Sequence, residues 1–281
     1  MSFRPRRSVL YMPGANERAL EKAKTLAADA LILDLEDSVG PAQKDEARAR
    51  VAAVVAGGGY GKRELIVRSN GLDTEWGMAD MAMAAKARPD AILVPKVSTA
   101  ADVARAAALA QGVPLWVMIE TPLAILNLKE IGAAAKDARL TCFVLGTNDL
   151  IKDARCKPVQ ARFALVPMLS QTVVAARAFG LDVIDGVYND FKNEDGFAAE
   201  CEQGVALGMD GKTLIHPGQV EPCNRIFSPS AEEVARARAI IAAFALPENE
   251  KKGVITVDGR MAERLHLAMA ERLVAIAEAI Q

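Results

Sequence analysis

The chain has 281 residues, of which 51% are hydrophobic, and a formal net charge of −2. This length suits one large domain or one domain with a small appendage. The nearly neutral net charge argues against a nucleic-acid-binding protein, because most domains of that class are basic. No apolar run reaches the roughly 18 residues of a membrane span, and the first residues lack the apolar stretch of a signal peptide. We therefore expect a cytoplasmic protein without nucleic-acid or membrane partners.

Eight short apolar runs, rich in Val, Ile and Leu, recur along the chain. Their spacing averages about 29 residues, the size of one β/α unit with its loop. Near-continuous apolar runs are typical of strands that are buried on both faces of a parallel sheet. The predicted strands cover residues 8–12, 30–34, 64–68, 91–95, 115–120, 141–146, 182–187 and 213–216.

Ala-rich amphipathic segments separate these runs and predict helices. In the first segment Asn16 can cap a helix whose inner face carries Leu20, Ala23 and Ala27. Because strands and helices alternate, the sheet should be parallel, and eight strands favour a closed (β/α)₈ TIM barrel over an open doubly wound sheet. The other predicted helices cover residues 44–55, 74–87, 99–111, 125–135, 161–179 and 197–207.

The alternating pattern stops after His216, so the predicted barrel domain covers residues 1–228. Residues 229–281 form a predicted C-terminal helical extension, with a helix over 231–245, a short strand over 254–257 and a last helix over 261–280. The sequence is compatible with an extension that covers the barrel mouth and with one that packs on a neighbouring subunit.

Polar and charged residues follow the eight runs. In a (β/α)₈ barrel the active site lies at the C-terminal ends of the strands. One charged strand end is usually a solvated loop, but eight in register indicate a site. These residues are Pro13, Gly14, Asp34, Glu36, Asp37, Arg68, Asn70, Lys96, Glu120, Asn148, Asp149, Asp185, Asn189 and His216.

Glu120 and Asp149 are the candidate metal ligands. Each follows one of two neighbouring strands, which lie about 5 Å apart, so the two carboxylates can converge on one cation. A buried carboxylate needs such a partner because an isolated charge is costly to bury. Carboxylates with water or substrate as the remaining ligands suit Mg²⁺, whereas zinc favours His or Cys ligands. The alternative is an ion pair of Glu120 with Lys96 or Arg68.

Arg68 ends the third run, and its planar fork suits bidentate binding of a carboxylate or an enolate-like oxygen. The alternative is a salt bridge to Glu36 or Asp37, and such a bridge could also orient Arg68 for substrate. Asp34, Glu36 and Asp37 crowd four positions, so repulsion can raise one pKa enough for acid–base catalysis. The other interpretation of this cluster is one solvated carboxylate and one helix cap.

Three further features carry weaker signals. The basic tip formed by Arg4, Arg6 and Arg7 fits a solvated tail better than a phosphate contact. His216 is more often structural at such a position than catalytic. The four cysteines form no Cys-x-x-Cys pair, so neither a zinc site nor a redox motif is indicated.

Taken in chain order, the motifs resemble one known family. The chain is similar to the CitE-like branch of the HpcH/HpaI aldolase and citrate lyase superfamily, which includes the citrate lyase β subunit, malyl-CoA lyase and citramalyl-CoA lyase. The resemblance covers nearly the whole chain, and the ordered set of motifs is highly specific. The motifs are RSVLYMPG at 7–14, DLEDSV at 34–39, Arg68 with Asn70, PK at 95–96, ET at 120–121, GTND at 146–149 and KTLIHP at 212–217.

The resemblance implies a homotrimeric (β/α)₈ barrel that cleaves a 3-hydroxyacyl-CoA of the citramalyl-CoA or malyl-CoA type. The family reaction is a reversible Claisen-type cleavage that gives acetyl-CoA and a small 2-oxo acid. Mg²⁺ serves as a Lewis acid on the oxo-acid oxygens, and an arginine stabilises the developing oxyanion. The resemblance also implies Mg²⁺ ligation by Glu120 and Asp149, and binding of the 2-oxo acid or of the cleavage transition state by Arg68. From the residues themselves we predict catalysis by Arg68, Glu36 and Asp37, and substrate binding by Arg68, Glu120, Lys96 and Arg7. The CoA phosphates need cations, for which Arg7, Arg18 and Lys22 are the candidates.

The tail departs from the family pattern. The family often reads Asp-Gly-x-Met-Val/Ile-Asp-x-Pro there, and its last Asp reaches a neighbouring subunit's site as a proton carrier. This chain reads DGRMAERL over 258–265, so Glu263 replaces that Asp and the Pro is missing. We predict that Glu263 is catalytic, and that Glu263→Gln lowers lyase activity.

Three other functions stay open at this point. The same scaffold could serve a malyl-CoA thioesterase, a non-catalytic CitE-like subunit, or an aldolase that acts on free acids. The presence of Glu120, Asp149 and Arg68 argues against the non-catalytic subunit. The choice among malyl-CoA, citramalyl-CoA and β-methylmalyl-CoA rests on one methyl group, worth only about 1–3 kcal/mol in a pocket.

Overall fold

The computed structural model describes residues 4–157 and 162–280. Eight parallel strands close into a barrel in chain order, with β1 paired to both β2 and β8. The strands are β1 (Ser8–Pro13), β2 (Ala30–Asp34), β3 (Glu64–Arg68), β4 (Ala91–Val94), β5 (Leu115–Ile119), β6 (Leu140–Leu145), β7 (Asp182–Asp185) and β8 (Gly211–Leu214). The predicted (β/α)₈ TIM barrel is confirmed.

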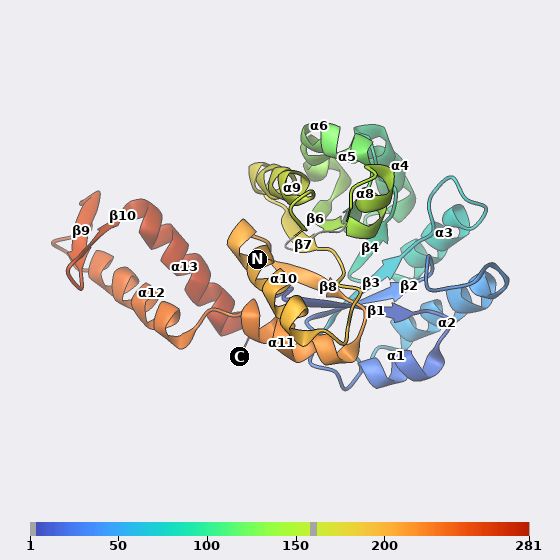
Figure 1. The fold of residues 1–281 in the computed structure, drawn as a ribbon, viewed down its shortest axis with the longest axis horizontal. Helices are drawn as coiled ribbons and strands as arrows, with labels where there is room; N and C mark the ends of the chain where they lie inside the picture. The colour runs from blue at the N-terminus through green and yellow to red at the C-terminus, as the bar shows by residue number, and fades with distance from the viewer. Residues whose placement is uncertain (1–3, 158–161, 281) are drawn as a thin grey trace. The chain divides into compact units, whose positions relative to one another are not determined.

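Helices follow the strands around the barrel (Figure 1). Asn16 caps the first one, as predicted, by accepting a hydrogen bond from the Ala19 N–H at 3.0 Å. These elements are α1 (Glu17–Ala23), η1 (Pro41–Gln43), α2 (Lys44–Gly57), α3 (Gly77–Ala87), α4 (Ala100–Ala110), α5 (Pro122–Leu126), α6 (Leu128–Ala133), α7 (Ala135–Ala138), α8 (Thr147–Asp153), α9 (Val166–Ala178), α10 (Glu194–Leu207), η3 (Pro217–Gln219) and α11 (Val220–Ile226).

Two of the predicted barrel helices differ markedly from the observed ones. The single helix expected over 125–135 is three short helices, because the Asn127 backbone leaves the helical region (φ −102°, ψ 11°) and its amide donates to the Ser98 carbonyl at 2.9 Å. The helix expected over 161–179 begins at Val166, where Pro167 occupies its first turn. Its predicted first residue, Ala161, lies outside the described residues.

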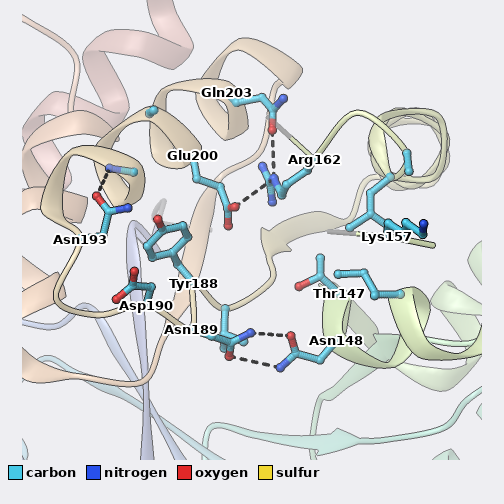
Figure 2. Close-up of a pocket in the computed structure, with 16 residues that line it drawn as sticks. Thr147, Asn148, Lys157, Arg162, Tyr188, Asn189, Asp190, Asn193, Glu200 and Gln203 are labelled. Carbon is cyan, nitrogen blue, oxygen red and sulfur yellow. Dashed lines mark hydrogen bonds and ion pairs between the residues drawn. The ribbon is translucent and has the colours of Figure 1, made fainter. Parts of the chain in front are cut away.

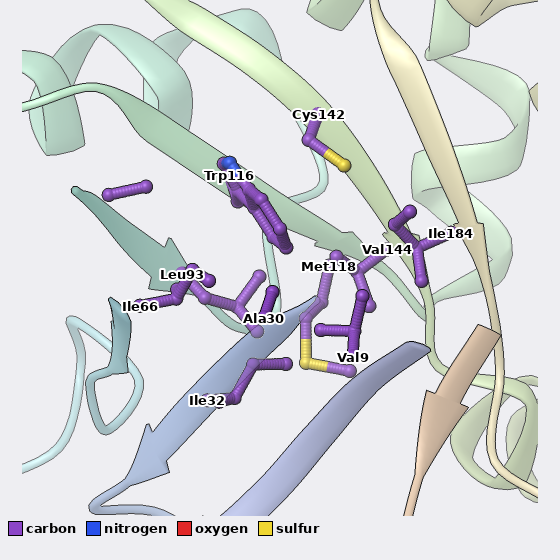
Figure 3. Packing of buried hydrophobic residues seen from close by; sticks show 11 residues of the cluster. Val9, Ala30, Ile32, Ile66, Leu93, Trp116, Met118, Cys142, Val144 and Ile184 are labelled. Carbon is purple, nitrogen blue, oxygen red and sulfur yellow. The ribbon is translucent and has the colours of Figure 1, made fainter. Parts of the chain in front are cut away.

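Alternate residues of the strands fill the barrel interior (Figure 3). Ala30 and Ile32 of β2 face this core, and so do Trp116 and Met118 of β5. Because side chains alternate along a strand, the next inward positions at the C-terminal ends are Asp34 on β2 and Glu120 just beyond β5. The same count brings Tyr11 and Arg68 inward after Val9 and Ile66. The alternation therefore places these four polar side chains at the C-terminal end of the apolar core that fills the barrel.

Arg6 closes the opposite, N-terminal end of the barrel. Its guanidinium carbon lies 4.7 Å from the centre of the Trp116 ring. The same side chain forms ion pairs of 2.7 Å with Glu64 and 2.6 Å with Asp182. The prediction of a solvated basic tail is therefore wrong for Arg6, because a cation that bridges two strands from inside the barrel is structural.

The segment from Ile226 onward belongs to a second compact unit, separate from Arg6–Arg225. It contains α12 (Ala231–Phe244), the antiparallel strands β9 (Val254–Val257) and β10 (Arg260–Glu263), and α13 (Arg264–Ala279). Phe244, Ile255 and Ala262 form its small core. The last helix was predicted to start at residue 261, but the Asp258-Gly259 turn, with φ of 49° and 73°, first folds a hairpin. None of the helices in the described ranges has the length and apolar character that crossing a bilayer requires.

Candidate active site

A cavity of about 300 Å³ opens at the C-terminal ends of the barrel strands. We call it the mouth cavity. Half of the fourteen residues predicted from strand ends line it. Its polar and charged lining includes Tyr11, Asp34, Asp37, Ser38, Arg68, Glu120, Thr147, Asn148, Asp149 and Asn189.

Arg68 is held in this cavity by a bidentate ion pair with Asp34. The two residues are direct partners in the β2–β3 register, and the Nε–Oδ1 and Nη2–Oδ2 distances are 2.7 and 2.8 Å. Both side chains are almost fully buried. Despite that burial, the charge and hydrogen bonds of Arg68 hold the pKa of Asp34 below its ordinary value. Such charge-assisted, forked pairs fix orientation as well as charge.

The remaining nitrogen of Arg68, Nη1, faces two more carboxylates. It lies 2.8 Å from Glu36 and 3.4 Å from Asp37, so the predicted salt bridge is present. The Tyr11 ring covers the guanidinium, with its centre 4.7 Å from Cζ. Glu36 is nearly buried, whereas Asp37 is 75% exposed and lines the cavity. Glu36 therefore pairs with Arg68 without lining the mouth cavity, and Asp37 is the carboxylate that a ligand can reach.

Glu36 is placed to titrate near neutral pH. Burial, followed by repulsion from Asp37, Glu120 and Asp34, raises its pKa to about 8, although Arg68 favours the ionised form. One guanidinium already bound by Asp34 cannot neutralise three carboxylates. One pKa in the predicted acidic cluster is thus raised, by burial first and by the crowding of carboxylates second.

This raised pKa makes the folded protein less stable as the pH rises. Between its ordinary value near 4.5 and about 8, Glu36 binds a proton in the folded state that it lacks in the unfolded state. The free energy of unfolding should therefore fall across this window, by at least ~1 kcal/mol. Urea unfolding at pH 5, 6.5 and 8 should show a shallower fall in Glu36→Gln than in the wild type. Equal slopes would show that Glu36 is ionised throughout.

Glu120 and Asp149 meet at one cation, the ammonium of Lys96. Lys96 Nζ lies 3.3 Å from Glu120 Oε1 and also contacts Asp149 Oδ2. The Lys96 N–H donates to Glu120 Oε1 at 2.7 Å, and Lys152 donates to Asp149 Oδ1 at 2.7 Å. Burial raises the pKa of Glu120, whereas the hydrogen bonds from Lys152 and Lys96 outweigh burial and lower the pKa of Asp149. The predicted alternative, an ion pair of Glu120 with Lys96, is thus present.

The pair also has the chemistry of a divalent-cation site. Its two carboxylates come from neighbouring strand ends and already share one positive group, the Lys96 ammonium. No group of three or more His, Cys, Asp or Glu side chains that could hold a metal occurs in the described ranges. Two carboxylates leave the remaining positions to water and substrate, as Mg²⁺ prefers. Mg²⁺ binding by Glu120 and Asp149 remains a prediction.

Gly146 makes room for the Glu120 carboxylate. A Cβ at position 146 would lie 2.4 Å from Glu120 Cβ and 2.5 Å from its Oε2. We expect Gly146→Ala to displace Glu120, to weaken Mg²⁺ binding at least about tenfold and to destabilise the fold by ~1–3 kcal/mol. Calorimetry with MgCl₂ and urea unfolding measure both effects. Gly57→Ala is the matched control, since nothing lies within 4 Å of its new Cβ, and an unchanged Mg²⁺ affinity in Gly146→Ala would contradict the steric role.

Arg7 and His216 do not line the mouth cavity. Arg7 precedes β1, at the end of the barrel opposite to the mouth cavity, where it pairs with Asp29 at 2.8 Å. The structure therefore does not bring Arg7 to the predicted substrate site. His216 Nδ1 accepts from the Gly218 N–H at 3.1 Å, a local structural role. Glu263 lies at the start of α13 in the second unit, where its N–H donates to His266 Nδ1 at 2.9 Å.

A second cavity, of about 570 Å³, lies between α8 and α10 (Figure 2). It shares Thr147, Asn148, Val187 and Asn189 with the mouth cavity. The amides of Asn148 and Asn189 donate to each other's oxygens at 3.3 and 2.8 Å, as the dashed lines show. This reciprocal pair forms part of the wall between the two cavities.

Behind that second cavity, Asp185 is fully buried between two cations. Lys212 Nζ lies 3.0 Å from its Oδ2, and Arg162 Nη1 lies 2.7 Å from its Oδ1. Both cations outweigh the effect of burial and hold the pKa of Asp185 below its ordinary value. Asp185, one of the polar strand ends, is thus neutralised internally and does not line the mouth cavity.

Asp34 and Tyr11 are the site residues that sequence reasoning missed. Asp34 belongs to the predicted acidic cluster without a role of its own, and Tyr11 lies within the first predicted strand. The available signal was the count of two along each strand from the inward residues Ile32 and Val9. Reading the strands as uniformly buried runs hid that alternation.

The fold and the site together define a (β/α)₈ barrel with an oriented arginine beside a carboxylate pair. Both lie at the C-terminal ends of the strands, where enzymes with this fold have their active sites. The chain belongs to the HpcH/HpaI aldolase/citrate lyase family, whose model matches residues 7–217. A second model, for C–C bond lyases of the TIM-barrel fold, matches residues 163–280. The predicted family is confirmed.

Named relatives cover almost the whole chain. A (3S)-malyl-CoA thioesterase of Cereibacter sphaeroides is 52% identical over 98% of this chain and 96% of its own length. The citrate lyase subunit beta of Escherichia coli is 35% identical over 95% and 94%. A crystal structure of CitE from Mycobacterium tuberculosis in complex with magnesium, acetoacetate and coenzyme A superposes with a TM-score of 0.79, at 27% identity over 96% of this chain and 97% of that one.

Proposed function

We propose that this protein is a Mg²⁺-dependent enzyme that hydrolyses the thioester of a malyl-CoA-type 3-hydroxyacyl-CoA. The observation that carries the proposal is Arg68, fixed by Asp34, in one cavity with the carboxylates of Glu120 and Asp149. An oriented cation beside a divalent-cation site suits a substrate that carries a carboxylate. The 52% identity to a thioesterase favours hydrolysis over carbon–carbon cleavage, which reverses the order expected from the resemblance alone.

The chain's own residues supply binding, charge and a base. Nη1 of Arg68 presents positive charge where an oxyanion forms on the thioester carbonyl. Bound Mg²⁺ would supply Lewis-acid polarisation of substrate oxygens. Asp37 is exposed and lines the cavity, so it is the residue to accept a proton from the attacking water and return it to the departing CoA thiolate. Glu36 keeps Arg68 in place. Because its raised pKa favours the protonated form, Glu36 adds little negative charge beside the guanidinium.

Lyase activity is the second candidate. The match to C–C bond lyases and the 35% identity to citrate lyase subunit beta favour it. In this reaction Arg68 would stabilise the 2-oxo acid, and Glu263 from a neighbouring subunit would carry the proton to or from the acetyl-CoA carbon. With either activity we propose a homotrimer with a cytoplasmic location. We also propose that Arg18 and Lys22 contact the CoA phosphates.

Product analysis separates the candidates. The protein is incubated with malyl-CoA and MgCl₂, and free thiol, malate, acetyl-CoA and glyoxylate are followed by mass spectrometry. Hydrolysis gives malate and CoA in equal amounts, and EDTA should stop it. Acetyl-CoA and glyoxylate would instead establish the lyase. If neither product set appears with malyl-CoA, citramalyl-CoA or β-methylmalyl-CoA, the proposed function is wrong.

A further inference from the structure

Lys96 adopts an unusual backbone conformation at the edge of the mouth cavity. It follows β4 with φ of 58°, in the left-handed region that is unfavourable for a residue with a side chain. Such outliers persist where the surrounding contacts hold them, and they gather at functional sites. Here the contacts that hold Lys96 are carboxylates, because its N–H donates to Glu120 Oε1 at 2.7 Å.

The ammonium of Lys96 joins two carboxylates that would otherwise repel each other. Nζ lies 3.3 Å from Glu120 Oε1 and donates to Asp149 Oδ2. Glu120 is 2% exposed, so its charge needs a partner, and Asp149 is 23% exposed. Lys96 itself is 44% exposed and can therefore move toward solvent without opening the core.

A metal ion and this ammonium require the same oxygens. Both are cations, and like charges so close together repel strongly in a partly buried site. The two therefore cannot occupy the space between Glu120 and Asp149 together.

We propose that Lys96 is an internal counter-ion of the metal site, which Mg²⁺ has to displace, so that Lys96 sets the affinity of the site for metal. The proposal rests on the proposed function for the identity of the metal and its ligands. Lys96 is thereby a positioning residue: it keeps the two carboxylates together and weakens their hold on the ion.

Lys152 provides a matched comparison. Its ammonium donates to Asp149 Oδ1 at 2.7 Å, and the two residues lie three positions apart on α8. It is 67% exposed, and none of its ion pairs includes Glu120. Removing either lysine removes one positive charge beside Asp149, but only Lys96 bridges the two carboxylates.

Titration calorimetry with MgCl₂ alone, on the full chain stripped with EDTA, tests the proposal. Lys96→Gln should bind Mg²⁺ about tenfold more tightly than the wild type, which corresponds to 1.4 kcal/mol. Lys96→Arg, which keeps the charge, should stay within about threefold, and so should Lys152→Gln. Lys96→Gly, in which the left-handed backbone is relaxed, should also bind more tightly and replaces Lys96→Gln if that variant does not fold.

Opposite results have separate meanings. Equal or weaker Mg²⁺ binding by Lys96→Gln and Lys96→Gly, with clear binding by the wild type, overturns the counter-ion role and leaves the proposed function standing. Equal tightening in Lys152→Gln also overturns it, because general charge would then be the cause. If the Lys96 variants bind Mg²⁺ and the wild type does not, the counter-ion role is supported. If neither the wild type nor any variant binds Mg²⁺, both proposals are overturned.

Discussion

Glu120→Gln should lower kcat/KM for malyl-CoA about a thousandfold, equivalent to ~4 kcal/mol, and should abolish measurable Mg²⁺ binding. The amide oxygen can still accept the hydrogen bond that the Lys96 N–H now donates to Oε1. The loop after β4 should therefore keep its place, and the loss should report the missing charge. Because Glu120 is 2% exposed and its pKa is raised by burial, a neutral side chain there should not destabilise the fold.

Glu130→Gln is the matched control for this substitution. Glu130 lies on α6, at the surface of the same barrel. Both variants should unfold within about 1 kcal/mol of the wild type in urea, as surface and isosteric changes usually do. Full activity of Glu120→Gln without added metal would refute the assignment of Glu120 as a ligand.

Arg68→Lys should lower kcat/KM by roughly 100- to 1000-fold, the cost of losing one oriented donor to an oxyanion. A lysine keeps the charge but cannot make two parallel hydrogen bonds to Asp34 while presenting a third nitrogen to the cavity. Because Asp34 is buried, its partly unsatisfied carboxylate should also cost ~1–3 kcal/mol of stability. Steady-state kinetics and urea unfolding of the same preparation measure the two effects.

Arg105→Lys is the control for this substitution, because Arg105 is 48% exposed and pairs with the exposed Asp73. It should change neither activity nor stability. Mg²⁺ affinity should be almost unaffected in Arg68→Lys, which separates its role from that of Glu120. A variant that is destabilised but fully active would show that Arg68 serves the fold alone.

Much of the barrel could be predicted because its signals are local. Apolar runs and capping residues such as Asn16 mark individual elements, and their regular spacing indicates one repeated β/α unit. Boundaries that depend on a distant contact could not be predicted, as at Asn127, whose amide bonds the carbonyl of Ser98 in another loop. The hairpin at Asp258-Gly259 is different, because an Asp-Gly turn is a local signal; the predicted helix start at residue 261 overlooks it, and residues 261–263 belong to β10.

The candidate site was predictable in its members but not in its pairings. Position after a strand pointed to Arg68, Glu120 and Asp149, since all strand ends of a parallel barrel meet at one rim. The partner of Arg68 depended on register, which places Asp34 directly beside it. No spacing along the chain reveals that Gly146 must lack a side chain to admit Glu120.

The amino-acid sequence by itself determined the barrel, the family and the rim residues, because strand periodicity and ordered motifs are properties of neighbouring positions. Only the tertiary structure decided that Arg7 faces away from the site and that Lys96 joins the two candidate metal ligands. It also showed that Glu36 supports Arg68 from behind, while Asp37 lines the cavity. These relations join residues far apart in the chain, so they are fixed by barrel closure and strand register and not by local sequence.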